Sequence, residues 1–123
     1  MNDTHLKSHH MSAILTADWS VYDWSEADFI RVLKSAALSA KLTPVGELSV
    51  SFHPQGVSAV VLLAESHVAL HFWPEKRKVS VDIHVCDYRG DNLDKANKLA
   101  DLLTIKLSEN SQKESWKYLE IIG

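Results

Sequence analysis

The chain has 123 residues, of which 46% are hydrophobic and 24% charged, and its formal net charge is −3. These values predict one soluble globular domain, and the lack of a basic excess argues against nucleic acid or a membrane surface as a partner. The single cysteine excludes an internal disulfide, and no zinc-like cysteine–histidine spacing occurs, so no metal is expected. Residues 1–11 lack the apolar run of a signal peptide and are expected to be a flexible N-terminal leader of a cytoplasmic protein.

Strands and helices are predicted from the period of the apolar residues. Alternation of apolar and polar residues is typical of a strand with one buried face, and apolar residues three and four apart are typical of an amphipathic helix. In chain order the sequence predicts a strand over about residues 12–18, a helix over 26–42, strands over 47–52, 57–64, 67–73 and 79–86, a helix over 91–109 and a strand over 116–122.

Local signals refine this assignment. Ser25, followed three residues later by Asp28, resembles the capping box that starts a helix, and Pro44 would stop that helix. Residues 57–64 are almost continuously apolar, which favours a strand covered on both faces. Short connections between the middle strands favour an α+β domain, a two-layer sandwich of an antiparallel β-sheet with two helices packed on one face. The other face would need a partner, so a homodimer is expected.

Candidate functional residues gather in the middle of the chain. Ser66 and His71 belong to the segment around the predicted strand 67–73, and the only thiol, Cys86, ends the strand 79–86. Taken singly, each has a plain structural explanation, because small thiols and strand histidines are often core residues. On neighbouring strands of one sheet, however, a serine, an imidazole and a thiol could together perform self-processing followed by decarboxylation.

The same segment carries a family resemblance. The chain reads GVSAVVLLAESH over residues 56–67, HFWPE over 71–75 and VDIHVC over 81–86. This pattern resembles the small prokaryotic S-adenosylmethionine decarboxylase proenzymes, which are pyruvoyl-dependent, and it implies their fold and activity for this chain. The implied substrate is a small-molecule amino acid, S-adenosylmethionine, and the implied product is its decarboxylated form, which is used in spermidine biosynthesis.

The resemblance implies self-cleavage between Glu65 and Ser66 into a β chain (1–65) and an α chain (66–123). Ser66 Oγ would attack its own preceding carbonyl, and elimination and hydrolysis would then leave a pyruvoyl group derived from the serine. That group is the implied cofactor: it forms a Schiff base with the substrate amine and acts as an electron sink when carbon dioxide leaves.

Roles for the remaining residues also come from the resemblance. His71 would be the processing base, Ser58 would support processing, and Cys86 would return a proton to the substrate Cα. The aromatic rings would hold the adenine and a glutamate would hold the ribose hydroxyls. The expected substrate-binding residues are Phe52, Trp73 and Glu75.

Departures from the family pattern leave alternatives open. Asp87 stands where the family commonly has glycine, and His84 stands where it usually has an apolar or aromatic residue. The same chemistry on arginine or ornithine would need a carboxylate for the distal cation, for which Asp18, Asp82 or Asp87 are candidates. An unprocessed, non-catalytic regulatory relative is a further alternative. A serine hydrolase is disfavoured, because no G-x-S-x-G elbow surrounds the serine.

Overall fold

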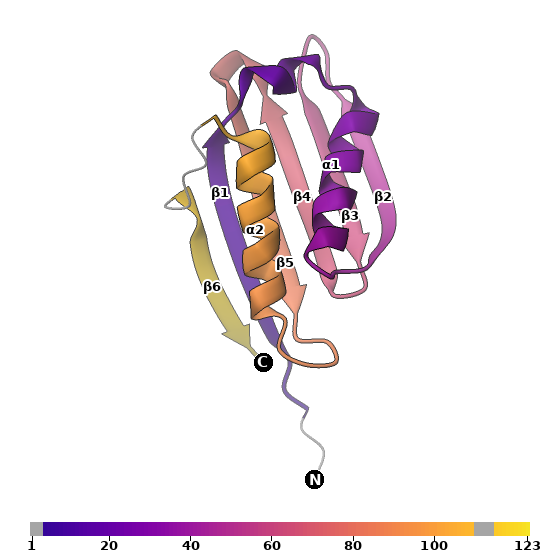
Figure 1. The fold of residues 1–123 in the computed structure, drawn as a ribbon, viewed down its shortest axis with the longest axis vertical. Helices are drawn as coiled ribbons and strands as arrows, with labels where there is room; N and C mark the ends of the chain where they lie inside the picture. The colour runs from indigo at the N-terminus through magenta and orange to yellow at the C-terminus, as the bar shows by residue number, and fades with distance from the viewer. Residues whose placement is uncertain (1–3, 110–114) are drawn as a thin grey trace.

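The computed structural model describes residues 4–109 and 115–123 of the chain. The elements, in order, are β1 (Lys7–Thr16), the 3-10 helix η1 (Trp19–Asp23), α1 (Glu26–Ser39), β2 (Pro44–Ser51), β3 (Val57–Leu63), β4 (Ser66–Trp73), the 3-10 helix η2 (Pro74–Lys76), β5 (Lys78–Cys86), α2 (Leu93–Leu107) and β6 (Lys117–Ile122). The strands form one antiparallel sheet in the order β2-β3-β4-β5-β1-β6. Both helices cover the same face of this sheet (Figure 1). The predicted two-layer α+β class is therefore confirmed.

The helix α1 begins as the sequence predicts. Ser25 Oγ accepts a hydrogen bond from the Asp28 N–H at 3.2 Å, and the Asp28 carboxylate accepts one from the Ser25 N–H at 2.8 Å, which completes the capping box. The helix ends at Ser39, three residues before the predicted end. It ends there because Lys41 adopts a left-handed backbone conformation (φ 65°), which cannot continue a right-handed helix.

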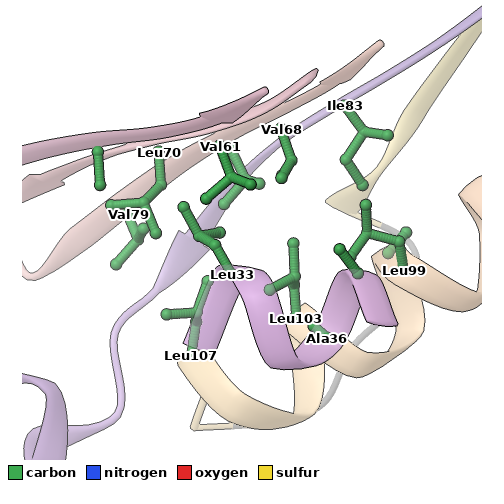
Figure 2. Close-up of a cluster of buried hydrophobic side chains, with 14 of the residues drawn as sticks. Leu33, Ala36, Val61, Val68, Leu70, Val79, Ile83, Leu99, Leu103 and Leu107 are labelled. Atoms are coloured by element: carbon green, nitrogen blue, oxygen red, sulfur yellow. The ribbon is translucent and has the colours of Figure 1, made fainter. Parts of the chain in front are cut away.

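The core lies between the helices and one face of the sheet. Leu33 of α1 and Leu103 of α2 point toward Val61, Leu70 and Ile83 of the central strands, and all five side chains are fully buried or nearly so (Figure 2). Each large aliphatic side chain buried in this way contributes about 1.5–3 kcal/mol. This packing fixes the position of the central strands, and with them the polar residues at the strand ends.

The strand β1 corrects the predicted leader. It begins at Lys7, so residues 7–11 are strand and not flexible leader. Backbone pairing explains this, because β1 lies between β5 and β6 and its peptide groups are hydrogen-bonded on both sides. His9 is only 2% exposed and its ring is hydrogen-bonded on both nitrogens. A polar segment is thus ordered by partners that are distant in sequence.

Two other boundaries differ from the prediction. Pro44 is the first residue of β2 rather than part of a loop, and the pairing with β3 shifts between Pro44 and Gly46. Proline is tolerated there because β2 is an edge strand, and the first residue of an edge strand needs no backbone N–H on the side that has no neighbouring strand. The helix α2 starts at Leu93 instead of residue 91, with Asn92 as its N-cap.

The second face of the sheet is not covered by any described element of the chain. Ile14, Leu48, Leu62 and Leu119 lie on it and are 66, 65, 51 and 59% exposed. The exposure of Leu62 contradicts the prediction that the strand over 57–64 is covered on both faces, as far as one chain is concerned. An isolated chain therefore leaves apolar side chains of four strands in contact with solvent, and we call this surface the open face.

Candidate active site

The peptide bond that precedes Ser66 lies in a tight turn. Leu63 of β3 pairs directly with Ser66 of β4, so Ala64 and Glu65 alone connect the two strands. Ser66 has a φ of 148°, a backbone conformation that residues with side chains rarely adopt. Such strain persists only where the surroundings enforce it, and it is frequent at reactive sites.

The surroundings of Glu65 enforce this turn. The Glu65 side chain is 6% exposed, and its carboxylate accepts hydrogen bonds from the N–H and Oγ1 of Thr43 at 3.0 and 3.1 Å. The Glu65 carbonyl oxygen accepts a hydrogen bond from the Cys86 N–H at 2.8 Å. The turn is thus held from the segment before β2 and from the end of β5.

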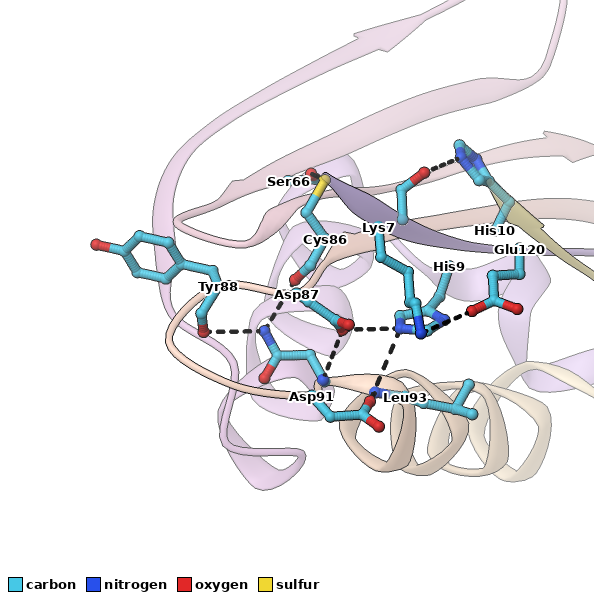
Figure 3. A network of polar contacts seen from close by, with 12 residues as sticks. Lys7, His9, His10, Ser66, Cys86, Asp87, Tyr88, Asp91, Leu93 and Glu120 are labelled. Carbon is cyan, nitrogen blue, oxygen red and sulfur yellow. Dashed lines mark hydrogen bonds and ion pairs between the residues drawn. The ribbon is translucent and has the colours of Figure 1, made fainter. Parts of the chain in front are cut away.

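The Cys86 thiol lies beside the Ser66 hydroxyl. Its Sγ is 3.3 Å from Ser66 Oγ (Figure 3). The same sulfur is 3.6 Å from Nε2 of His84, and the cysteine is half-buried. Burial, and the nearby charges of His10 and His67, hold the pKa of His84 below its ordinary value of 6.5. The structure therefore brings Glu65, Ser66 and Cys86 together, and we call this group the thiol corner.

A polar network supports the thiol corner from the helix side. His9 Nε2 is 2.8 Å from Asp87 Oδ1 (Figure 3). His9 Nδ1 is 2.7 Å from the Tyr118 hydroxyl. Burial opposes ionisation of Asp87, but hydrogen bonds from the Asn92 N–H and from His9, and the charges of His9 and Lys7, hold its pKa below the ordinary 3.8.

This network also contains the one group of residues that resembles a metal site within the described ranges. His9, Asp87 and Asp91 place their donor atoms within 4.8 Å of one another. Their atoms already bind protein groups, because Asp87 also accepts from the Asn92 N–H and Asp91 from the Leu93 N–H. We therefore interpret the group as a structural tie between β1, β5 and α2.

A cleft of about 300 Å³ lies at the opposite end of the strands. Its lining contains aromatic, amide, imidazole and carboxylate groups, and it includes Gly56 of the β2–β3 turn. The residues that line it are Phe52, Gln55, Gly56, Val57, Ser58, His71, Phe72, Trp73 and Glu75. Gly56 has a φ of 106°, and an added Cβ would lie 3.3 Å from the Phe72 carbonyl oxygen, so only glycine suits this position.

Two polar contacts organise the side chains of the cleft. Ser58 and His71 are paired across β3 and β4, and Ser58 Oγ lies 2.6 Å from His71 Nδ1. The Trp73 indole N–H donates to Ser80 Oγ at 3.4 Å. Five of the residues expected from the sequence, namely Phe52, Ser58, His71, Trp73 and Glu75, therefore share this cleft.

The structure does not bring the two groups together within one chain. Ser66 and His71 are five residues apart on β4, and a strand rises about 3.3 Å per residue, so about 17 Å separates the thiol corner from the Ser58–His71 pair. Cys86 lies at the same end of β5 as Ser66, because the strands β4 and β5 are antiparallel and Ser66 pairs with Val85.

Some expected residues lie elsewhere, and some important ones were not expected. Asp18 caps η1, Asp82 accepts from the Ser12 hydroxyl and Asp87 binds His9, so none of the three carboxylates lines the cleft. Sequence reasoning missed Thr43 as the partner of Glu65. A threonine before a strand carries no local signal of this contact, which only the tertiary fold creates.

With this geometry in place, comparison with known proteins identifies the class. A model of the S-adenosylmethionine decarboxylase family matches residues 21–114, and the chain therefore belongs to this family. The resemblance noted in the sequence is confirmed.

Individual relatives are consistent with that assignment. The S-adenosylmethionine decarboxylase proenzyme of Pelotomaculum thermopropionicum is 32% identical over 102 residues, covering 83% of this chain and 80% of that protein. The proenzyme of the same name from Archaeoglobus fulgidus is 43% identical over 70 residues, 55% of this chain and 60% of that protein. The crystal structure of the adenosylmethionine decarboxylase from Aquifex aeolicus is similar, with a TM-score of 0.70, 27% identity and coverage of 98% of this chain and 91% of that one.

The extent of these matches differs among relatives. The chain spans about 60% of the length of the Archaeoglobus and Hydrogenobaculum relatives that it matches.

Among the helices of the described residues, none is long and apolar enough to cross a membrane.

Proposed function

We propose that this chain is a self-processing, pyruvoyl-dependent decarboxylase that removes carbon dioxide from S-adenosylmethionine, and thereby supplies spermidine biosynthesis. The observation that carries the proposal is Ser66, which combines a strained backbone with a hydroxyl group beside the chain's only thiol. The relatives named proenzymes add support, because a proenzyme must be cut before it acts. We place the enzyme in the cytoplasm, where the free thiol of Cys86 stays reduced.

The contacts of the Glu65–Ser66 bond support cleavage there. Ser66 Oγ attacks the Glu65 carbonyl carbon, so the amide becomes an ester and the Ser66 nitrogen takes up the proton. The Cys86 N–H, 2.8 Å from the Glu65 oxygen, stabilises the negative charge that grows on this oxygen. Release of the strain at Ser66 lowers the barrier further. A base then removes the Ser66 Cα proton while the Glu65 carboxylate leaves Cβ, which frees a β chain (1–65). Hydrolysis of the resulting dehydroalanine releases ammonia and leaves an α chain (66–123) with a terminal carbonyl.

The thiol corner fits a pyruvoyl group, because Ser66 lies at the start of a strand with its side chain against a half-buried thiol. Such a group supplies a carbonyl that takes up the electron pair left by departing carbon dioxide. Cys86 provides the proton for the substrate Cα, since its sulfur lies 3.3 Å from the Ser66 oxygen and a protonated thiol is a competent general acid.

The cleft supplies the groups that S-adenosylmethionine needs. Phe52 and Trp73 offer two aromatic faces, on which an adenine stacks with about 1–3 kcal/mol per base. An aromatic face also attracts the positively charged sulfonium. The Glu75 carboxylate, on η2 directly after Trp73, accepts hydrogen bonds from ribose hydroxyls.

We further propose that the enzyme is a homodimer that pairs through the open face. A two-fold axis in the plane between two facing sheets, perpendicular to the strands, reverses their direction. The thiol corner of one chain then faces the cleft of the second chain, and the distance of about 17 Å along β4 no longer separates them. The apolar residues Ile14, Leu48, Leu62 and Leu119 support this arrangement, because pairing removes them from water.

Mixed dimers test this shared site. A Ser66→Ala chain keeps its cleft and a Trp73→Ala chain keeps its thiol corner, so a mixed dimer contains one complete site. Random association of equal amounts makes about half of the dimers mixed, each with one working site of two, and about a quarter of the unmutated activity should return. Activity no greater than that of the separate variants would show that each chain builds its own site.

Intact-mass spectrometry and substrate assays test the activity itself. We expect two fragments, 1–65 and 66–123, with the second blocked by a carbonyl at its N-terminus. A single chain of full mass contradicts processing and leaves the non-catalytic regulatory relative. We expect labelled carbon dioxide from S-adenosylmethionine and none from arginine or ornithine. If carbon dioxide is released from arginine or ornithine alone, the substrate assignment is wrong and the proposed mechanism still holds.

A further inference from the structure

Three histidines gather beside Cys86 on the open face. His84 precedes the cysteine by two residues on β5, and its register partners on the two neighbouring strands are His10 of β1 and His67 of β4. The rings of His10 and His84 are stacked with centroids 4.1 Å apart, and the ring of His67 meets that of His84 edge-on at 5.1 Å. The imidazoles thus form a continuous row across three strands.

The row ends at the thiol, because His84 Nε2 lies 3.6 Å from Cys86 Sγ. We propose that His84 is a positioning residue that controls the proton on the Cys86 thiol, and that His10 and His67 pass protons to it. The catalytic meaning of this inference rests on the proposed function, whereas the contact of imidazole and thiol does not.

The charged and titratable groups around His84 favour such a relay. His10 faces it from β1, His67 from β4, and Cys86 and Asp82 from its own strand β5, with Asp82 already bound by a serine hydroxyl. Burial, followed by the charges of His10 and His67, lowers the pKa of His84 and so favours the neutral ring. Adjacent imidazoles repel one another when both are charged, and a proton that enters the row is therefore passed on.

The proton balance of one turnover is simple. The thiol of Cys86 gives its proton to the substrate carbon, and the S–H bond electrons stay on sulfur as a thiolate. His10 or His67 passes one proton from water to His84, and Nε2 of the protonated ring transfers it to Sγ, which restores the thiol and the neutral ring. One proton is consumed for each carbon dioxide released.

Alkylation with iodoacetamide tests the contact without catalysis. Cys86 is the only cysteine, so the alkylation rate of the uncleaved Ser66→Ala chain reports on this thiol alone. His84→Phe removes the N–H donor of the thiolate and should raise the pH midpoint of alkylation by about one unit, a tenfold slower reaction below the midpoint. His53→Phe, at an exposed loop histidine, should leave the midpoint unchanged. An unmoved or lowered midpoint in His84→Phe overturns the inference.

A second measurement needs no substitution of His84. Interacting groups titrate as a pair, so the NMR titration of the His84 ring should contain an additional inflection from the thiol. Cys86→Ser should remove that inflection. Identical curves in the two proteins overturn the inference, whether or not His84→Phe folds.

Steady-state kinetics test the relay. His84 does not line the cleft, so His84→Phe should lower kcat about tenfold and leave KM unchanged. An unchanged kcat overturns the relay. If no variant and no parent protein releases carbon dioxide, the proposed function has failed, while alkylation and NMR still decide whether His84 controls the thiol.

Discussion

The two ends of β4 differ in how their functional groups are held. At the Ser66 end the backbone is strained, and the neighbouring Glu65 is 6% exposed and hydrogen-bonded to Thr43. At the other end Trp73 is 48% exposed, and Phe52 across the cleft is 52% exposed. A reaction within the backbone needs fixed geometry, which buried contacts provide. Recognition of a ligand needs surfaces that remain accessible until the ligand, or a second chain, covers them.

The largest expected effect comes from removing the reactive hydroxyl. Ser66→Ala should abolish cleavage and carbon dioxide release completely, because alanine has no oxygen to attack the Glu65 carbonyl. Intact mass and a gel of the purified protein measure this. Ser35→Ala, on an exposed position of α1, is the matched control and should be cut normally. A cut Ser66→Ala chain would contradict the mechanism.

The next largest effect separates the two roles of the thiol corner. Cys86→Ser should still be cleaved, because the backbone N–H that binds the Glu65 oxygen remains. Its decarboxylation should fall about 100-fold or more, since a hydroxyl is a much weaker acid than a thiol. Single-turnover release of carbon dioxide from the cleaved variant measures this. If cleavage itself stopped, the side chain and not the backbone would be the essential group.

A smaller effect is expected at the cleft end. Trp73→Ala should raise KM roughly 5- to 150-fold, which corresponds to about 1–3 kcal/mol of lost stacking. Cleavage should persist, because the Ser66 hydroxyl and the Cys86 N–H that binds the Glu65 oxygen both remain. Trp19→Ala removes an exposed tryptophan outside the cleft and should leave KM unchanged. If the two substitutions changed KM equally, the cleft would not be the substrate-binding site.

The smallest effect concerns stability against pH. The pKa of His84 is lower in the folded chain than its ordinary 6.5, so the unfolded chain binds more protons as the pH falls through 6.5. Stability from this group is therefore present above pH 6.5 and is lost below it. The midpoint temperature of thermal unfolding should decrease between pH 7.5 and pH 5.5, and this decrease should be about 1–3 °C smaller in His84→Phe. Calorimetry at both pH values checks this, and an unchanged slope would contradict it.

The parts of the fold that depend on local pattern were predictable. The spacing of Phe29, Leu33 and Ala36 predicts the buried side of α1, and all three are buried. The capping box at Ser25 marks the start of this helix correctly. These features follow from the geometry of a single element, which the order of residues determines directly.

The parts that depend on register were not predictable. The motif residues Ser66 and His71 are close in sequence, yet a strand of eight residues carries them to different sites. The contact of His84 with the thiol and its row of imidazoles appear only when β1, β4 and β5 are aligned. The start of β1 at Lys7 likewise depends on pairing with β6, which is more than 100 residues away.

The strand order has a consequence for a chain that is cut between β3 and β4. One fragment would contain β1, α1, β2 and β3, and the other would contain β4, β5, α2 and β6. Because β1 lies between β5 and β6, strands of the two fragments alternate in part of the sheet. Three strand pairings, β3–β4, β5–β1 and β1–β6, join one fragment to the other. They could part only by unfolding, and reassembly after denaturation would become a bimolecular event whose rate depends on protein concentration.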